Sequence, residues 1–211
     1  MIESYNELPV GKYLEIQEII KEDMSDIDKQ VAIIAVLTDL TENEVLNIPI
    51  TEYKGYAEKS MFLDRHMDVP KQVASVYEIG DWKLIPTTDI RKMTTAQYID
   101  FQTFSKEGDT KVVETLSCFL VPKGKKYNDD YDIVEVQNAI REHLAIPHCF
   151  ALIAFFLTRF NHLILGTLIY CKWMTKLTMK KSPQKKEILN RIEELIKGLP
   201  NGNYGLDVLM P

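Results

Sequence analysis

Histidine and cysteine, the residues that bind zinc, come closest together at His143, His148 and Cys149. Structural zinc is held by four ligands of these types at characteristic spacings. His143 and His148 are five residues apart, which places them on different faces of a helix, and Pro147 interrupts a helix between them. No further ligands follow at a suitable spacing, so we expect neither a metal ion nor another cofactor.

Two other groups have side chains capable of chemistry. The sequence NDDYD at 128–132 is acidic, but it lacks the glycine and the distal glutamate of a calcium-binding loop, so we interpret it as a solvated loop. Cys118 lies in the apolar sequence LSCFLV, and a thiol buried there would be inert. The motifs GxSxG, HExxH and GxGxxG and the phosphate-binding loop do not occur. We therefore predict no catalytic residues and no enzymatic activity.

Lysine is concentrated near the C-terminus. The predicted basic patch consists of Lys172, Lys176, Lys180, Lys181, Lys185 and Lys186. Residues 171–198 hold eight basic and three acidic residues, whereas the whole chain has a net charge of −6. A basic segment can bind nucleic acid, an acidic partner or a second copy of the chain. Lysines at a helix C-terminus also complement the helix dipole, so a solvated turn explains them equally well. The acidic total makes nucleic acid the less favoured partner.

A tyrosine followed four residues later by a glutamine occurs twice, as Tyr13 with Gln17 and as Tyr98 with Gln102. Residues four apart share one face of a helix. Such pairs could form hydrogen bonds across the junction of two helical units and fix their register, or they could belong to a partner-binding surface. Because buried polar groups are usually satisfied internally, we favour the structural role.

These pairs belong to a longer internal similarity. LPVGKYLEIQEI at 8–19 matches MTTAQYIDFQTF at 93–104, and SDIDKQVAIIAV at 25–36 matches TKVVETLSCFLV at 110–121 at the same offset of 85. We predict an internal duplication with helical units at 1–63 and 93–146. Each unit is too small to bury its own apolar faces, so the two should pack on each other.

The remaining segments complete the predicted fold. VASVYEIGDWKLIP at 73–86 has β-branched and aromatic residues around Gly80-Asp81, which is typical of a hairpin turn, so we predict a β-hairpin bridge at 64–92. Residues 147–211 should form a long apolar helix, a capped final helix and a short tail. The predicted fold is therefore mainly α, with two related helical units joined by a small β-hairpin and extended by long C-terminal helices.

The long apolar segment at 149–174 raises the question of a membrane. Arg159, Asn161 and His162 interrupt it, and the run before Arg159 is about ten residues, against the ~20 that a span needs. We therefore predict a buried or partner-covered helix and no membrane contact. The predicted partner-binding residues on it are Phe155, Phe156, Phe160, Leu163, Tyr170 and Trp173.

The three cysteines, Cys118, Cys149 and Cys171, are odd in number and widely spaced, which is typical of reduced thiols in a cytosolic protein. The opening residues MIESYNELPV have no basic region followed by an apolar one, so we expect no secretory signal.

The succession LPVGKYLEIQEI, VAIIAVLTDLTENEVLNIPITEY, MTTAQYIDFQTF and FLVPKGKKYNDDYD resembles morphogenesis proteins of tailed phages that infect Bacteroidetes, including crAss-like phages. The opening pattern VGKYLEIQEI with ITEY is also similar to tail-assembly and baseplate-assembly chaperones. The resemblance implies a non-enzymatic chaperone that binds other phage structural proteins in the host cytoplasm. A virion component of the neck, tail or internal cargo is the alternative, self-association is compatible with both, and a nucleic-acid-binding accessory protein is the third hypothesis.

Overall fold

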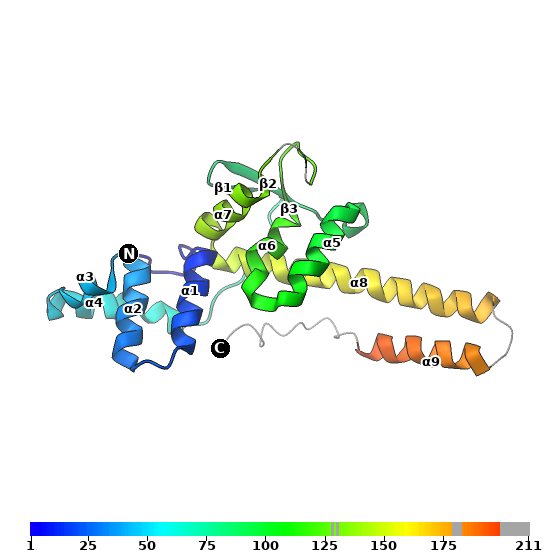
Figure 1. Cartoon of the computed structure of the whole chain (residues 1–211), viewed down its shortest axis with the longest axis horizontal. Coiled ribbons are helices and arrows are strands. Elements are labelled where there is room, and N and C mark those ends of the chain that lie inside the picture. The colour runs from blue at the N-terminus through cyan, green and yellow to red at the C-terminus, as the bar shows by residue number, and fades with distance from the viewer. Residues whose placement is uncertain (128, 130, 179–182, 199–211) are drawn as a thin grey trace. The chain divides into compact units, whose positions relative to one another are not determined.

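The computed structural model describes residues 1–127, 129, 131–178 and 183–198, and most of these residues are helical (Figure 1). The α-helices are α1 (Val10–Lys21), α2 (Asp26–Thr38), α3 (Glu42–Leu46), α4 (Ile50–Ser60), α5 (Thr95–Phe104), α6 (Val112–Ser117), α7 (Ile133–His143), α8 (Ile146–Thr178) and α9 (Pro183–Gly198). Short 3-10 helices are η1 (Met61–Asp64), η2 (Ile90–Lys92) and η3 (Ser105–Lys111), and the strands are β1 (Tyr77–Ile79), β2 (Trp82–Pro86) and β3 (Leu120–Pro122). The predicted mainly α fold with a small sheet and long C-terminal helices is confirmed.

Local capping signals explain where several helices begin. The Ser25 side chain accepts a hydrogen bond from the backbone N–H of Asp28 at the start of α2. Thr41 and Thr94 each form a capping box, in which the side chain three residues later bonds back to the cap backbone. Helix α4 begins at Ile50 directly after Pro49 and has no side-chain cap.

The chain forms two compact units. The first comprises residues 1–87 and 93–151, and the second comprises 88–92 and the residues from 152 onward. The predicted helical units at 1–63 and 93–146 both belong to the first of these, together with most of the predicted bridge at 64–92.

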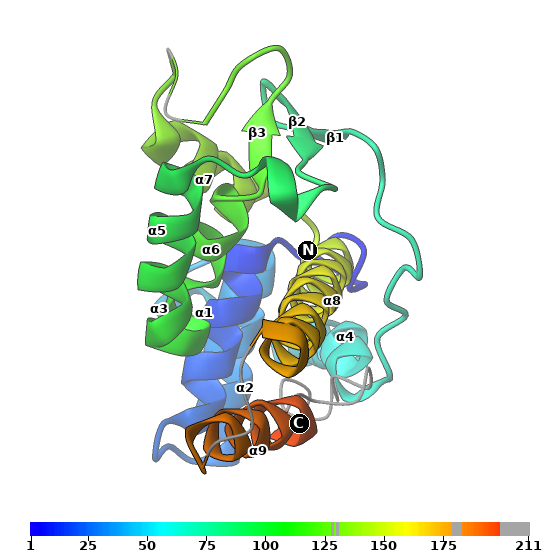
Figure 2. The ribbon, with the colours of Figure 1, turned by 90° about the vertical axis from the view of Figure 1, so that its right-hand side faces the viewer.

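Close packing of α1 against its neighbours organises the first unit. Helix α1 packs on α2 and on α7, and α7 also packs on α6 (Figure 2). A Cβ atom at Gly11 would lie 2.7 Å from Cγ of Arg141, so glycine permits the approach of α1 to α7. Backbone hydrogen bonds of 2.9 Å run from Val10 N to Leu144 O and from Ile146 N to Leu8 O. They join the segment before α1 to the segment between α7 and α8.

The hairpin β1–β2 forms where the sequence predicts it. Gly80 occupies the turn with φ of 55°, a conformation that favours glycine, and Tyr77 pairs with Leu84. A third strand was not predicted, because residues 110–121 read as one helix. Instead α6 ends at Ser117, and β3 pairs antiparallel with β2. The open edge of β2 supplies the backbone partners that make the extended conformation favourable there.

The predicted internal duplication is not shown. In the first predicted copy α1 and α2 are two regular helices, whereas the second contains α5, η3, the short α6 and then β3. The burial of the matched tyrosines also differs, since Tyr13 is buried and Tyr98 is 48% exposed. The sequence similarity therefore does not correspond to one repeated helix pair.

Candidate partner-binding arm

The second unit contains a helical hairpin that we call the arm, formed by α8 from Leu152 onward and by α9. Nζ of Lys172 lies 2.9 Å from Oε1 of Glu193, and Nζ of Lys185 donates to the carbonyl oxygen of Lys176 at 2.8 Å. Figure 1 shows α9 running back beside α8. Ile192 of α9 is buried. Two polar contacts thus join the two helices.

One side of α8 within the arm carries large side chains that are exposed. Leu163, Tyr170 and Trp173 are 36%, 58% and 56% exposed. A Cβ atom added at Gly166 would meet no atom within 4 Å. With Arg159, which is also exposed, these residues are separated by alternating intervals of four and three, which keep them on one face of a helix. We call Arg159, Leu163, Gly166, Tyr170 and Trp173 the open face.

The predicted partner-binding residues are divided between two environments. Leu163, Tyr170 and Trp173 lie on the open face, and the rings of Tyr170 and Trp173 are 6.3 Å apart. Phe155 and Phe160 are half-buried, and Phe156 is buried.

Arg159 and Gly166 also lie on the open face but were not among the predicted partner-binding residues. Arg159 lies with its guanidinium carbon 5.2 Å from the centre of the Phe155 ring. The alternating spacing of four and three residues is the sequence signal that would have found both positions.

The predicted basic patch contributes partly to the internal structure of the arm. Lys172 is half-buried against Glu193, and its hydrogen bond is the main cause that lowers the pKa of the Glu193 carboxyl. Lys185 contacts the backbone of α8, while Lys176 and Lys186 are exposed. Lys180 and Lys181 lie outside the described residues. At least two of the lysines therefore have structural partners.

The apolar character of α8 also bears on a membrane. By length and composition alone α8 is able to cross one, as are the core helices of many soluble proteins, so this is weak evidence. Arg159 and His162 lie near its middle, and a charged side chain at the centre of a bilayer is costly. The absence of membrane contact stays a prediction.

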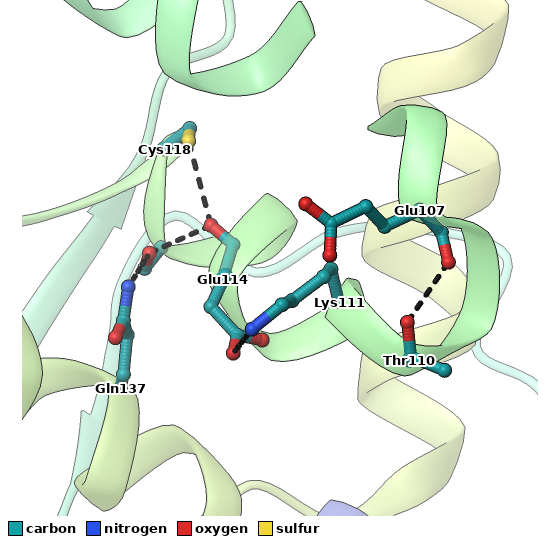
Figure 3. A network of polar contacts seen from close by, with 7 residues as sticks. Glu107, Thr110, Lys111, Glu114, Cys118 and Gln137 are labelled. Atoms are coloured by element: carbon teal, nitrogen blue, oxygen red, sulfur yellow. Dashed lines mark hydrogen bonds and ion pairs between the residues drawn. The ribbon is translucent and has the colours of Figure 1, made fainter. Parts of the chain in front are cut away.

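A network of polar contacts in the first unit is the other candidate site (Figure 3). Nε2 of Gln137 donates to Oγ of Ser117 at 3.1 Å, and Oγ of Ser117 donates to the Glu114 carbonyl at 2.7 Å. Nζ of Lys111 lies 3.1 Å from Oε1 of Glu114. These contacts connect η3, α6 and α7, so the network has a clear structural role.

Cys118 belongs to a buried chain of polar groups. Its sulfur lies 3.8 Å from the hydroxyl of Tyr127, which donates to Oδ2 of Asp100 at 2.8 Å. Burial is the main cause that raises the pKa of the Cys118 thiol to about 12, and burial also raises the pKa of Tyr127. Because a thiolate is the reactive form, Cys118 is a poor nucleophile at neutral pH.

The structure places the other sequence candidates apart from a common site. The ring of His148 packs edge-on against Tyr77, with ring centres 5.7 Å apart, and the ring of Tyr13 packs in the same way on Phe150 at 5.8 Å. Within the described residues, no group of three or more His, Cys, Asp or Glu side chains could hold a metal ion. Gln17 and Gln102 are half-buried, and their role in fixing a register stays a prediction.

No protein-family model, curated protein or solved structure matches this chain. Its function is therefore inferred from the arm, from the distribution of charge and from the sequence resemblance described above.

Proposed function

We propose that this protein acts without catalysis, by binding other proteins during the assembly of a phage particle, and that the arm is its docking surface. The observation that carries the proposal is the exposure of Tyr170 and Trp173 side by side on the open face. Exposed apolar patches often mark protein interfaces, and tyrosine and tryptophan are enriched among the residues that contribute most to binding.

Charge supports a docking role for the arm. Residues 1–151 contain 16 basic and 27 acidic residues, whereas residues 152–211 contain nine basic and four acidic residues. The arm thus belongs to a positive segment of an otherwise acidic chain. Opposite charges on two surfaces accelerate their encounter and select against wrong partners. An acidic surface on a partner would suit the rim of the open face.

The sequence resemblance favours an assembly chaperone of the tail or baseplate. In that role the open face would cover an apolar helical segment of a tail protein until the segment is buried in the particle, a helix-to-helix mode of recognition. A structural component of the neck, tail or internal cargo would use the same face for permanent contacts. The two roles differ in whether the protein remains in the mature particle.

Mass spectrometry of density-purified particles of the source phage separates these roles. Stoichiometric peptides of this chain would identify a virion component, and their absence, with abundant protein in infected cells, would identify a chaperone. Pull-downs from infected cells should recover phage structural proteins with the wild-type chain. They should recover far less with Tyr170→Ala/Trp173→Ala.

A matched control uses two exposed apolar residues elsewhere, in the double variant Ile27→Ala/Leu46→Ala, which should bind as the wild type does. If the wild-type chain recovers no phage protein, the proposed function is wrong. Retention of DNA at ~50 mM salt, lost at higher salt, would instead favour the nucleic-acid-binding alternative.

A further inference from the structure

The open face has a pattern that is symmetric about Gly166. Leu163 and Ile169 lie three residues to either side, His162 and Tyr170 lie four, and Arg159 and Trp173 lie seven. At ~1.5 Å of rise per residue, the last pair lies ~10 Å from Gly166 in both directions. Arg159 and Trp173 are thus equally far from Gly166 in opposite directions, and so are His162 and Tyr170.

We propose that the open face is covered by the open face of a second copy of this protein, with the two α8 helices packed antiparallel and crossing at Gly166. The proposal rests on the arm being the docking surface proposed above, and a phage protein that binds the open face would have to displace the second copy. An antiparallel crossing places Arg159 opposite the partner's Trp173 and His162 opposite the partner's Tyr170.

Complementarity of charge selects the antiparallel orientation. Helix α8 contains no aspartate or glutamate, so a parallel pair would place Arg159 beside its own counterpart with no neutralising group on the helix. In the antiparallel pair Arg159 meets an aromatic ring instead. Its guanidinium already lies over Phe155, and the Arg159 side chain is exposed, so a second ring can approach it.

The crossing point requires a small residue. Gly166 has no side chain, and the space around its Cβ position is empty, so two helix backbones can approach closely there. Leu163 and Ile169 flank the glycine and would pack against each other across the two-fold axis. The same surface of each copy forms the contact, so the assembly is complete with two copies.

The mass of the full-length protein in solution tests the proposal. Light scattering after size-exclusion chromatography should give a dimer. Trp173→Ala and Arg159→Ala should each raise the dissociation constant about tenfold or more, and Gly166→Leu should do so by blocking the crossing. Leu195→Ala, which removes an exposed apolar side chain from α9, should leave the constant unchanged. Circular dichroism establishes that each variant is folded.

Cysteine cross-linking tests the orientation. In a Cys171→Ser background, His162→Cys and Tyr170→Cys should form an intermolecular disulfide when mixed, and neither should cross-link with itself. Two copies of position 162 would lie ~12 Å apart along the antiparallel pair, beyond the ~7 Å that a disulfide spans between Cα atoms. Self-cross-linking of either variant alone would show a parallel pair and overturn the proposal.

Salt dependence separates this dimer from the docking of one copy's basic arm on the acidic residues of another. Two arms of the same charge repel, so raising the salt concentration should strengthen the proposed dimer. Weakening by salt would overturn it in favour of arm-to-body docking.

A monomeric wild-type chain would also overturn the proposal. If such a monomer still recovers phage proteins through the arm, the proposed function survives without the dimer. If it instead sediments with phosphatidylcholine vesicles, the open face is a membrane surface. A dimer that recovers no phage protein would support this inference while the proposed function fails.

Discussion

The side chain of Gln97 is tied to the backbone of Cys118, with its Nε2 donating to the Cys118 carbonyl oxygen at 2.9 Å. The Oε1 of the same amide accepts a hydrogen bond from Thr94 N, also at 2.9 Å. Gln97 is buried, so neither half of the amide has water as a substitute. One side chain therefore caps α5 and fixes the position where α6 gives way to β3.

Substitution of Gln97 by glutamate tests this double role. The carboxylate can still accept the hydrogen bond from Thr94, but it cannot donate to the Cys118 carbonyl. We expect Gln97→Glu to reduce the free energy of unfolding by about 1–3 kcal/mol, the usual range for an unsatisfied buried polar group. Urea denaturation gives the value. The same change at exposed Gln72 should have little effect, and equal losses at both positions would refute the role of Gln97.

The turn glycine Gly80 should not tolerate alanine. Its φ of 55° is unfavourable for a residue with a Cβ atom, and that atom would lie 3.0 Å from Cδ2 of His143. We expect Gly80→Ala to destabilise the protein by about 1 kcal/mol or more.

Gly55 provides a control of the opposite sign. It lies within α4, and a Cβ atom there meets nothing within 4 Å. Gly55→Ala should therefore stabilise the protein by about 0.5–1 kcal/mol through its higher helix propensity. Thermal unfolding of both variants measures the two shifts, and shifts in the same direction would contradict this explanation.

Alkaline pH should destabilise the protein through two of its thiols. Burial raises the pKa of Cys118 and of Cys149 from 9.0 to about 12. Because the folded state keeps these protons longer than the unfolded state does, their contribution to stability is present below pH 9 and is lost as the pH rises toward 12. We expect the free energy of unfolding to fall by about 1 kcal/mol per thiol per pH unit over this interval.

Denaturation at several pH values, with and without Cys118→Ala/Cys149→Ala, isolates this effect from the titration of lysines. The double variant should have a clearly smaller slope. An unchanged slope would show that other groups cause the alkaline loss.

The ion pair between Lys172 and Glu193 should hold the arm closed. Lys172→Glu should increase hydrogen exchange of the amides of α9, and the exchanged pair Lys172→Glu/Glu193→Lys should restore their protection. Lys186→Glu makes the same charge change at an exposed position and should not alter exchange. Lys172 lowers the pKa of the Glu193 carboxyl from its ordinary value of 4.5. The α9 amides of the wild-type protein should therefore lose protection against hydrogen exchange only when the pH falls below that value.

Local signals in the sequence predict much of this fold. The cap at Ser25, the capping boxes at Thr41 and Thr94 and the turn at Gly80 depend on residues a few positions apart, and the structure contains each of them. Strand β3 was beyond such reasoning, because its extended conformation depends on pairing with β2, which is distant in sequence. The same dependence on tertiary contacts explains why similar sequences at α2 and α6 have different structures.

Part of the arm was also predictable from the sequence. The apolar segment identified Leu163, Tyr170 and Trp173, since large residues recur on one face of a helix. The half-burial of Lys172 was not foreseen, because its partner Glu193 reaches it only after the chain has reversed direction between α8 and α9.

The hydrogen bonds between residues 8–10 and 144–146 have a consequence for synthesis on the ribosome. Leu8 and Val10 leave the exit tunnel early, yet their backbone partners are Ile146 and Leu144, which are made much later. Helices α1 and α2 therefore keep part of their apolar surface exposed until α7 has been synthesised and has left the tunnel. A nascent chain of this kind is a natural client for cellular chaperones, and a ribosomal pause would favour its correct closure only once residue 146 has left the exit tunnel.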